Sequence, residues 1–205
     1  MAARSWQPTT FRRFERALAS STHPAQIVTD AGHAYIKVIN NPIGPHALVR
    51  EWVGTSLARW FGLPTFDFAI LELDEMDEIP LHDNRRAQPG PAFVTRAVEG
   101  HPWGGRAEEL KLLDNPDAIS RLVVFDTWTQ NPDRHPPDLA TRQPHRDNVF
   151  LSGEGAMPGR FRLIAMDHTE CFFTPGRRDL TGHIATIDQI RDERVYGLFP
   201  EFVYP

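Results

Sequence analysis

Two strand-like runs in the second half of this 205-residue chain each carry a polar residue at one end. The first run, Asn148–Leu151, begins with an asparagine, and the second, Phe161–Met166, is followed directly by Asp167. Upstream, the loop Asn131–Arg146 follows a helix-like stretch and contains Asp133. Short apolar runs joined by a turn-rich loop are typical of a hairpin. The sequence therefore predicts a β-hairpin with an asparagine at its start, an aspartate at its end and a second aspartate in the loop before it.

The oxygen atoms of these three side chains suit phosphoryl transfer. Asn148 and Asp167 offer amide and carboxylate oxygens, which magnesium prefers. Asp167 follows an apolar strand, where a carboxylate is costly unless it is paired or metal-bound. Asp133 is the candidate base, because phosphotransferases use an aspartate to hold the acceptor hydroxyl near the metal and the nucleotide. The plainer alternatives are a turn-forming role for Asp133 after Asn-Pro and a strand-terminating cap for Asp167.

Two neighbouring residues are weaker candidates for the base. His145–Asn148 reads His-Arg-Asp-Asn, but in eukaryotic protein kinases the asparagine follows the aspartate by about five residues. Asp147 is therefore a minority alternative, and so is His135, which together with Arg134 can orient the loop by hydrogen bonds. The chain has no Gly-x-Ser-x-Gly, Walker Gly-Lys-Ser/Thr or His-Glu-x-x-His motif, and its nine histidines lack zinc spacing.

A lysine and a glutamate in the first half supply the phosphate side of such a site. Lys37 lies mid-strand, on the face that alternation also gives to Tyr35 and Ile39. Glu51 lies one turn into the most regular helical pattern of the chain, at the border of its apolar side. In kinases a strand lysine paired with a helix glutamate holds the nucleotide phosphates. The alternatives are an exposed strand lysine and a solvated helix charge.

Hydrophobic periodicity predicts an α+β chain. In the first half we expect a short helix at Thr10–Ala19, two strands around a turn at Gln26–Thr29 and Ala34–Ile39, and the main helix at His46–Phe61. These are followed by a strand at Phe66–Leu73, a surface excursion at Asp74–Gly90 and a further strand at Ala92–Val98. In the second half we expect a short helix at Glu108–Leu113, a longer one N-capped by Asn115, and another at Thr181–Arg194.

The composition limits which cellular compartment and which partners we expect for this chain. A net charge of −5 and the absence of basic runs make nucleic acid a poor partner. Cys171 is the only cysteine, so no internal disulfide can form and a reducing compartment is expected. The N-terminus lacks a signal-peptide core, and no apolar run approaches the roughly 18 residues of a membrane span. We therefore expect a cytoplasmic protein without a membrane partner. Cys171 has no obvious activating base and is interpreted as a buried or incidental thiol.

Four segments give the chain a resemblance to the HipA-like kinases, a family distantly related to phosphatidylinositol 3-/4-kinases. The resemblance covers roughly residues 27–201 and is strongest for the small members of the family. The two specific segments are Phe125–Arg134 and the hairpin runs Asn148–Leu151 with Leu163–His168. Tyr35–Val38 and Leu48–Pro64 add weaker support.

The resemblance implies a single kinase-like domain over residues 1–205 with a two-lobed protein-kinase-like fold. The N-lobe, about residues 1–100, would hold a small antiparallel sheet and one main helix. The C-lobe, about residues 101–205, would be mostly helical and carry the catalytic hairpin. The implied activity is ATP-dependent phosphorylation, usually of Ser or Thr in a protein, with an antitoxin-type protein as a further partner.

The resemblance also implies a role for each candidate residue. Lys37 would contact the ATP phosphates, and Glu51 would brace it. Asp133 would position or deprotonate the acceptor hydroxyl, while Asn148 and Asp167 would hold Mg²⁺. The hinge strand along the adenine would consist of Phe93, Val94, Thr95 and Arg96, ending at Ala97.

Two departures from the family pattern leave alternatives open. Asp133 and Asn148 are separated by the 14 residues Arg134–Asp147, where the family has only a few, so about ten residues are inserted in the catalytic loop. Only 38 residues follow Asp167, which predicts a thin, minimal or truncated C-lobe. An insert that displaces either side chain would leave a nucleotide-binding pseudokinase or interaction module. A lipid or small-molecule kinase is a third possibility, against which the acidic balance argues modestly.

Overall fold

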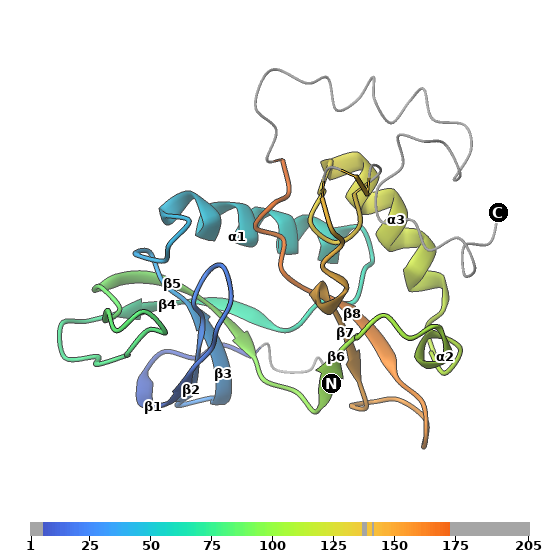
Figure 1. Cartoon of the computed structure of the whole chain (residues 1–205). Helices are drawn as coiled ribbons and strands as arrows, with labels where there is room; N and C mark the ends of the chain where they lie inside the picture. The colour runs from blue at the N-terminus through green and yellow to red at the C-terminus, as the bar shows by residue number, and fades with distance from the viewer. Residues whose placement is uncertain (1–5, 137–138, 141, 173–205) are drawn as a thin grey trace. The chain divides into compact units, whose positions relative to one another are not determined.

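A computed structural model describes residues 6–136, 139–140 and 142–172 of the chain (Figure 1). The chain divides into two compact units, the first drawn from Met1–Trp52 and Phe66–Ala97 and the second from Val53–Thr65 and Val98–Pro205. The described elements are two antiparallel sheets, of five and three strands, and a few helices. The α+β prediction is therefore confirmed. Within the described residues no helix has the length and apolarity that a membrane span requires.

The first unit contains a five-stranded antiparallel sheet in the order β1-β2-β3-β5-β4. The strands are β1 (Phe11–Ala17), β2 (Ala25–Thr29), β3 (Gly32–Lys37), β4 (Phe68–Leu73) and β5 (Gly90–Arg96). Gly32 has φ +105°, a conformation that glycine adopts without strain, at the predicted turn between β2 and β3. The strands predicted at the positions of β2, β3, β4 and β5 are present, with boundaries that differ by a few residues.

The helix predicted at Thr10–Ala19 is wrong, because this segment is strand β1. Phe11 pairs with Thr29 and Phe14 with Ile27, and the register shifts between Phe11 and Arg13 and again between Phe14 and Arg16. Each bulge adds one residue to the strand, so aromatic residues three apart point to the same face. A three-residue apolar spacing, which is typical of a helix, is in this case produced by a bulged edge strand.

The two faces of the sheet have different roles. Side chains on one face of β2, β3 and β5 form an apolar cluster with Leu71 and Leu73 of β4. Lys37 points to the opposite face, as predicted, because it is the cross-strand partner of Phe93 while its neighbour Ile36 belongs to the cluster. The alternation of β3 thus places the one lysine of the sheet away from the apolar core.

The segment Asp74–Gly90 is only partly the surface excursion that its polar composition predicts. Ile79 and Leu81 are 0% and 4% exposed and belong to the apolar cluster of the first unit. A bridge between Pro80 and Arg86 closes the segment on itself. The polar residues around these two aliphatic side chains gave no sign of their burial, which anchors the segment on the sheet.

The main helix, α1 (Pro45–Trp60), agrees with the prediction and ends at the predicted glycine. Gly62 has φ +82°, and the amides of Gly62 and Leu63 donate to the carbonyls of Arg59 and Ala58. This is the hydrogen-bond pattern of a Schellman C-cap, for which glycine is preferred. The first half of α1 belongs to the first unit and the second half to the second unit.

The second unit contains α2 (Ala107–Leu110), α3 (Asp117–Thr129), the 3₁₀ turn η1 (Arg146–Asn148) and a three-stranded sheet in the order β6-β7-β8. The strands are β6 (Gly100–Pro102), β7 (Val149–Ser152) and β8 (Arg162–Ala165). The predicted hairpin is β7 and β8. Its partner β6 was not predicted, since three residues ending in proline give no strand pattern. Gly100 is required there, because a Cβ would lie 2.2 Å from the Leu151 carbonyl oxygen.

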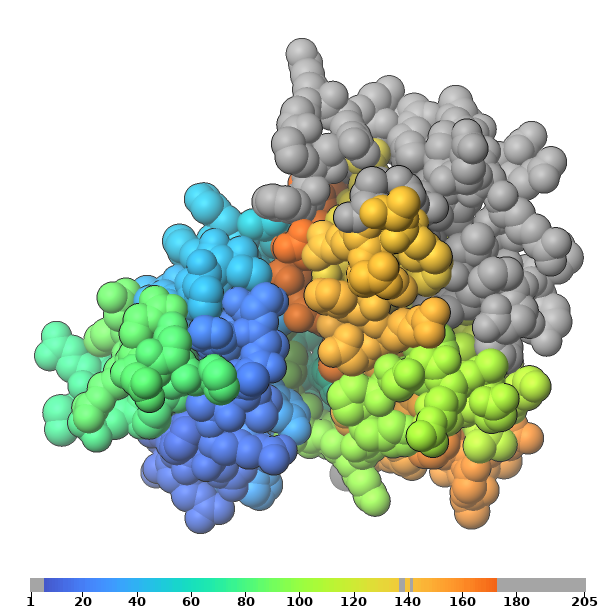
Figure 2. All heavy atoms as spheres, in the orientation of Figure 1, coloured from blue at the N-terminus to red at the C-terminus, as the bar shows by residue number. Residues whose placement is uncertain are grey.

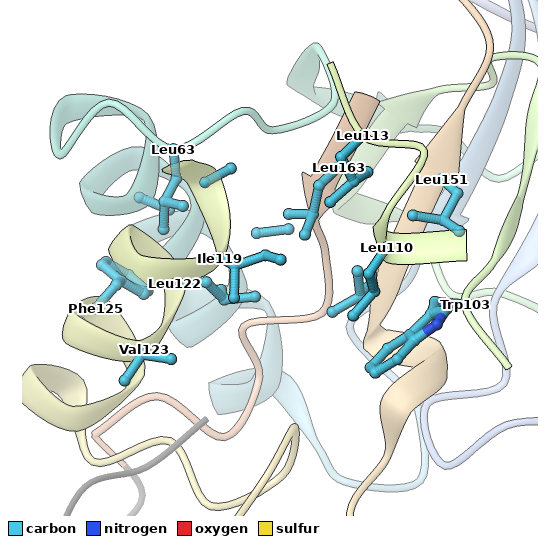
Figure 3. Close-up of a cluster of buried hydrophobic side chains, with 14 of the residues drawn as sticks. Leu63, Trp103, Leu110, Leu113, Ile119, Leu122, Val123, Phe125, Leu151 and Leu163 are labelled. Atoms are coloured by element: carbon cyan, nitrogen blue, oxygen red, sulfur yellow. The ribbon is translucent and has the colours of Figure 1, made fainter. Parts of the chain in front are cut away.

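An apolar core joins α3 to this sheet (Figure 3). Figure 3 shows side chains of α3 directed toward those that come from α2 and the strands. The fully buried members with the largest side chains include Ile119, Leu122, Phe125, Leu151 and Leu163. Burial of each such side chain stabilises the fold by roughly 1.5–3 kcal/mol. This core fixes the end of α3 against the hairpin, so the loop between them starts and ends at defined points.

Asn115 does not cap α3 through its side chain, which corrects the predicted N-cap. Its amide nitrogen donates to the Leu163 carbonyl at 3.1 Å, and its oxygen accepts from the Leu163 amide at 2.8 Å. The side chain therefore pairs with strand β8 as a short strand would. The predicted helix at Thr181–Arg194 lies outside the described residues.

Candidate active site

Lys37 and Glu51 form an ion pair in the first unit. Lys37 Nζ lies 2.8 Å from Glu51 Oε2, and the two side chains are 16% and 4% exposed. Lys37 is the last residue of β3, and Glu51 lies on the side of α1 that faces it. Trp52 fixes this part of α1 by packing edge-on against Phe68 of β4, with ring centroids 5.1 Å apart. The pairing predicted from sequence is thus present.

The four predicted hinge residues lie in β5. Phe93, Val94 and Thr95 pair with β3 on one side and with β4 on the other. Their main-chain groups are therefore engaged in the sheet, and Phe93 and Val94 are buried. Arg96 ends the strand and pairs with Asp67 at 3.1 Å. Contacts from this stretch to a ligand would come from side chains or from the end of the strand.

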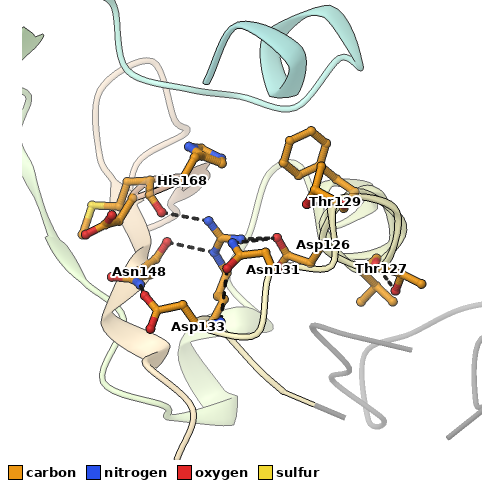
Figure 4. A network of polar contacts seen from close by, with 12 residues as sticks. Asp126, Thr127, Thr129, Asn131, Asp133, Asn148 and His168 are labelled. Carbon is orange, nitrogen blue, oxygen red and sulfur yellow. Dashed lines mark hydrogen bonds and ion pairs between the residues drawn. The ribbon is translucent and has the colours of Figure 1, made fainter. Parts of the chain in front are cut away.

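The centre of the second unit is a buried ion pair between Asp126 of α3 and Arg134 (Figure 4). Both side chains are 0% exposed. Arg134 also donates through Nε to the Asn148 carbonyl at 3.2 Å and through Nη2 to the Met166 carbonyl at 2.8 Å. One guanidinium therefore ties α3 to the start of β7 and the end of β8. Breaking a buried pair of this kind costs about 3–5 kcal/mol.

The pKa values of this pair reflect burial and mutual attraction. Burial raises the pKa of the Asp126 carboxyl, and the charge of Arg134 opposes that rise. Burial lowers the pKa of the Arg134 guanidinium, but the attraction of the Asp126 charge outweighs this effect, so the pKa of Arg134 lies above its ordinary value. Since a guanidinium stays protonated in proteins, Asp126 has a permanent cation beside it and we take the pair as ionised.

Asp133 is held at the end of a tight turn that follows α3. Gln130 ends the helix with φ +51°, and the Asn131 side-chain oxygen accepts the Asp133 amide at 3.1 Å. This Asx turn points the Asp133 side chain back toward the hairpin. Asn148 Nδ2 donates to Asp133 Oδ2 at 2.6 Å, as Figure 4 shows. The structure therefore brings Asp133 and Asn148 together although 14 residues separate them.

Asp133 has two further partners, both from the insert. Arg142 Nη2 donates to Asp133 Oδ1, and His145 Nδ1 lies 3.2 Å from the same oxygen. The His145 amide also donates to the Asp133 carbonyl at 2.9 Å. Asp133 is 6% exposed. The insert thus returns to its starting point, and part of it is visible on the face of the molecule shown in Figure 2.

Asp167 lies at the end of β8, on the same end of the hairpin as Asn148. The Met166 amide donates to the Asn148 carbonyl at 3.2 Å, continuing the register in which Val149 pairs with Ala165. Asp167 has φ +56°, a left-handed conformation that aspartate tolerates better than most residues. Its Oδ1 accepts the hydroxyl of Thr169 at 2.6 Å. The plainer alternative, a strand-terminating cap by Asp167, is therefore present as a bond to Thr169.

The residue after Asp167 anchors this end of the chain. His168 is fully buried and its Nδ1 lies 3.2 Å from Thr55 Oγ1 of α1. Gly54 lets the two segments approach closely, since a Cβ there would lie 2.6 Å from His168 Cβ. A larger residue at position 54 would push this segment, and Asp167 with it, away from the helix.

The weaker candidates are placed differently. Asp147 is exposed in η1, and Cys171 is fully buried, as predicted for an incidental thiol. Burial lowers the pKa of the His135 imidazole, and the Arg146 charge lowers it further. Two residues were not predicted: Arg142, which contacts Asp133, and Glu170, which contacts Arg142. The sequence offered no signal for them beyond the arginine content of the insert.

The donor set suits magnesium without forming a complete cage. Asn148 directs its amide nitrogen to Asp133, which leaves its Oδ1 without a hydrogen bond among the described residues. Asp167 supplies a carboxylate at the same end of the hairpin. No group of three or more acidic, His or Cys side chains in the described part of the chain is arranged to hold a metal. Magnesium is often bound by one or two protein oxygens together with phosphates and water, so these two residues fit it.

Comparison with known families matches residues 12–189, most of the chain, to a family described as HipA-like kinase. The chain belongs to the HipA-like kinase family. No curated protein matches the chain.

Proposed function

We propose that this HipA-like kinase transfers the γ-phosphoryl group of ATP, with Mg²⁺, to a Ser or Thr hydroxyl of a protein. The observation that carries the proposal is the 2.6 Å hydrogen bond from Asn148 to Asp133. It supports an insert that closes on itself and leaves the base beside the metal ligand. Phosphoryl transfer depends on positioning and charge neutralisation more than on covalent help, so this arrangement is what the reaction requires.

In this proposal each residue has a distinct task. Lys37, braced by Glu51, neutralises the nucleotide phosphates. Asn148 and Asp167 hold Mg²⁺, which when bound neutralises charge on the phosphate oxygens. Asp133 orients the acceptor hydroxyl and accepts its proton. The side chains of β5, with Phe93 beside Lys37, are our candidates for the adenine contact.

The two units are interpreted as the N-lobe and C-lobe of one kinase domain. We also propose a cytoplasmic location, which rests on the single cysteine of the chain. A protein substrate and an antitoxin-type protein partner are proposed on family membership alone.

A pseudokinase is the second candidate, because one observation favours it. Asp133 Oδ1 is held by two residues of the insert, Arg142 and His145. If these contacts block the acceptor, the protein binds nucleotide without turning it over. Nucleotide-induced thermal stabilisation without transfer to any acceptor would favour this candidate.

The test is incubation of the purified chain with γ-labelled ATP, with and without Mg²⁺, alone and with a cell lysate. The proposal predicts Mg²⁺-dependent label on Ser or Thr residues, located by mass spectrometry. Label that appears only in lipid or small-molecule fractions would mean that the acceptor is an alcohol of that kind and not a protein. No label and no ATP hydrolysis, despite nucleotide binding, would leave the pseudokinase.

A further inference from the structure

The insert supplies two of the three side-chain contacts that the Asp133 carboxylate makes within the described residues. Arg142 and His145 contact Asp133 Oδ1, whereas Asn148 contacts Oδ2. A carboxylate oxygen accepts about two hydrogen bonds. Within the described residues, Oδ1 is therefore filled, and Oδ2 keeps room for one more donor. An acceptor hydroxyl that bonds to Oδ2 would not have to displace either residue of the insert.

Arg142 is itself anchored at a second point. Its Nη1 lies 3.4 Å from Glu170 Oε2, so one guanidinium bridges two carboxylates. The side chain of Arg142 is 35% exposed, while those of Asp133 and Glu170 are 8% and 15% exposed. Two largely buried carboxylates on one cation are held in a fixed orientation, since a guanidinium presents its donors in a rigid plane.

The charges around Asp133 explain why a bridge is useful there. Arg134 lies close enough for the Asp133 charge to raise its pKa, but its hydrogen bonds go to Asp126, Asn148 and Met166. Arg134 therefore holds the backbone around Asp133 and not the carboxylate itself. Arg142 is the cation that contacts the carboxylate, and it comes from the part of the chain that departs from the family pattern.

We propose that Arg142 is a positioning residue for phosphoryl transfer, which clamps Asp133 against Glu170 so that Oδ2 faces the acceptor hydroxyl. The inference rests on the proposed kinase function. It gives the insert a role in catalysis. The short spacing between the aspartate and the asparagine in the family is replaced by a longer loop, and that loop supplies Arg142 to hold Asp133. Without the clamp, Asp133 would keep only Asn148 and His145 and would rotate about its side-chain bonds.

The test compares Arg142→Ala and Arg142→Lys with the wild type in Mg²⁺-dependent ATP turnover. Arg142→Ala is expected to lower kcat by about 10- to 100-fold, because a misplaced reacting group costs rates of that order. The KM for ATP should stay within about twofold, since Arg142 touches no proposed nucleotide contact. Arg142→Lys should recover only part of the rate, because an ammonium cannot bridge both carboxylates in one plane. Added guanidinium ion at low millimolar concentration should restore part of the rate of Arg142→Ala.

Arg146→Ala is the matched control, since Arg146 is exposed in the same insert and makes no contact with Asp133 in the described residues. Its turnover should equal that of the wild type. Thermal unfolding of all variants separates loss of rate from loss of fold, and rescue by guanidinium excludes an unfolded Arg142→Ala. If Arg142→Ala turns over ATP as fast as an active wild type, the inference is overturned and the proposed function stays intact. A rise in kcat also overturns it, because Arg142 would then block Asp133. A wild type without turnover overturns the proposed function and the inference with it.

Discussion

Two buried ion pairs in the described part of this kinase, Asp126–Arg134 and Lys37–Glu51, differ in what else they contact. Asp126 and Arg134 are both fully buried, and Arg134 also holds the Asn148 and Met166 carbonyls of two other segments. Lys37 is 16% exposed and joins one strand to one helix. Arg134 therefore acts as a structural centre, whereas Lys37 keeps some access to solvent, which its proposed contact with phosphates requires.

The difference shows how burial and residue type separate structure from function. A planar guanidinium suits three fixed acceptors in the interior, whereas a flexible ammonium suits a ligand that arrives and leaves. Loss of Arg134 should thus reduce stability first and activity as a consequence. Loss of Lys37 should reduce activity more than stability, although it leaves the Glu51 carboxylate without its counter-charge.

The largest expected effect is that of Arg134→Ala. The substitution leaves Asp126 buried without its counter-charge and frees two carbonyls, so the free energy of unfolding should fall by about 3–5 kcal/mol. Equilibrium unfolding in urea, followed by tryptophan fluorescence, measures this loss. The double variant Asp126→Leu with Arg134→Met should regain part of it, since apolar pairs often replace buried ion pairs at little cost. An Arg134→Ala variant as stable as the wild type would refute the structural role.

The second effect is that of Lys37→Met on turnover. Removing a positive charge proposed to face the phosphates should lower kcat/KM for ATP by about 100-fold, the order found when one transition-state contact is lost. The free energy of unfolding should also fall, because Glu51 is 4% exposed and loses its counter-charge, but by less than in Arg134→Ala, since Lys37 itself is partly exposed. Lys111, the only other lysine of the chain, is exposed, so Lys111→Met is the matched control. Equal kcat/KM values for the two variants would remove Lys37 from the site.

A smaller effect is expected for Glu51→Gln. Glutamine keeps a hydrogen-bonding oxygen but loses the charge, so Lys37 becomes less well oriented and about 1 kcal/mol of the interaction is lost. The KM for ATP should rise about fivefold, with a smaller change in kcat. Steady-state kinetics over a range of ATP concentrations separate the two parameters. A variant that loses as much activity as Lys37→Met would mean that Glu51 does more than brace the lysine.

The smallest effect concerns pH and His135. Burial and the Arg146 charge lower the pKa of His135 in the folded protein, so the unfolded chain binds this proton more tightly. The contribution to stability is complete above about pH 6.5, the unfolded value, and is lost as the pH falls below it toward the folded value. The loss of unfolding free energy between pH 7 and pH 5 should be smaller in His135→Asn than in the wild type. The exposed His46→Asn serves as control, and an unchanged pH dependence in His135→Asn would contradict the assignment.

The sequence was sufficient where one local pattern decided the outcome. The alternation of β3 placed Lys37, the periodicity of α1 placed Glu51, and the glycine at position 62 ended the helix. It misled in β1, where two bulges gave strand residues a helical spacing. It also gave no warning that the side chain of Asn115 would pair with β8.

In the candidate site, the sequence was enough to name Arg134 as a residue that orients the loop, but not to name Arg142 or Glu170. Asp126 offered a signal that a closer reading of α3 can use: a carboxylate one turn from Leu122 on the apolar side of a helix requires a buried partner. Arg142 offered none, because its contact with Asp133 depends on how the insert closes, which is a tertiary property. The return of the insert to Asp133 is set by the network around Arg134 and not by any local pattern.

The most direct test of the account is the comparison of turnover and nucleotide affinity in Asp133→Ala and Asp167→Ala. The account predicts that Asp167→Ala abolishes Mg²⁺-dependent ATP turnover. It predicts that Asp133→Ala does the same while ATP affinity, measured by calorimetry, remains close to that of the wild type. Undiminished turnover in both variants would contradict the assignment of this site as the centre of phosphoryl transfer.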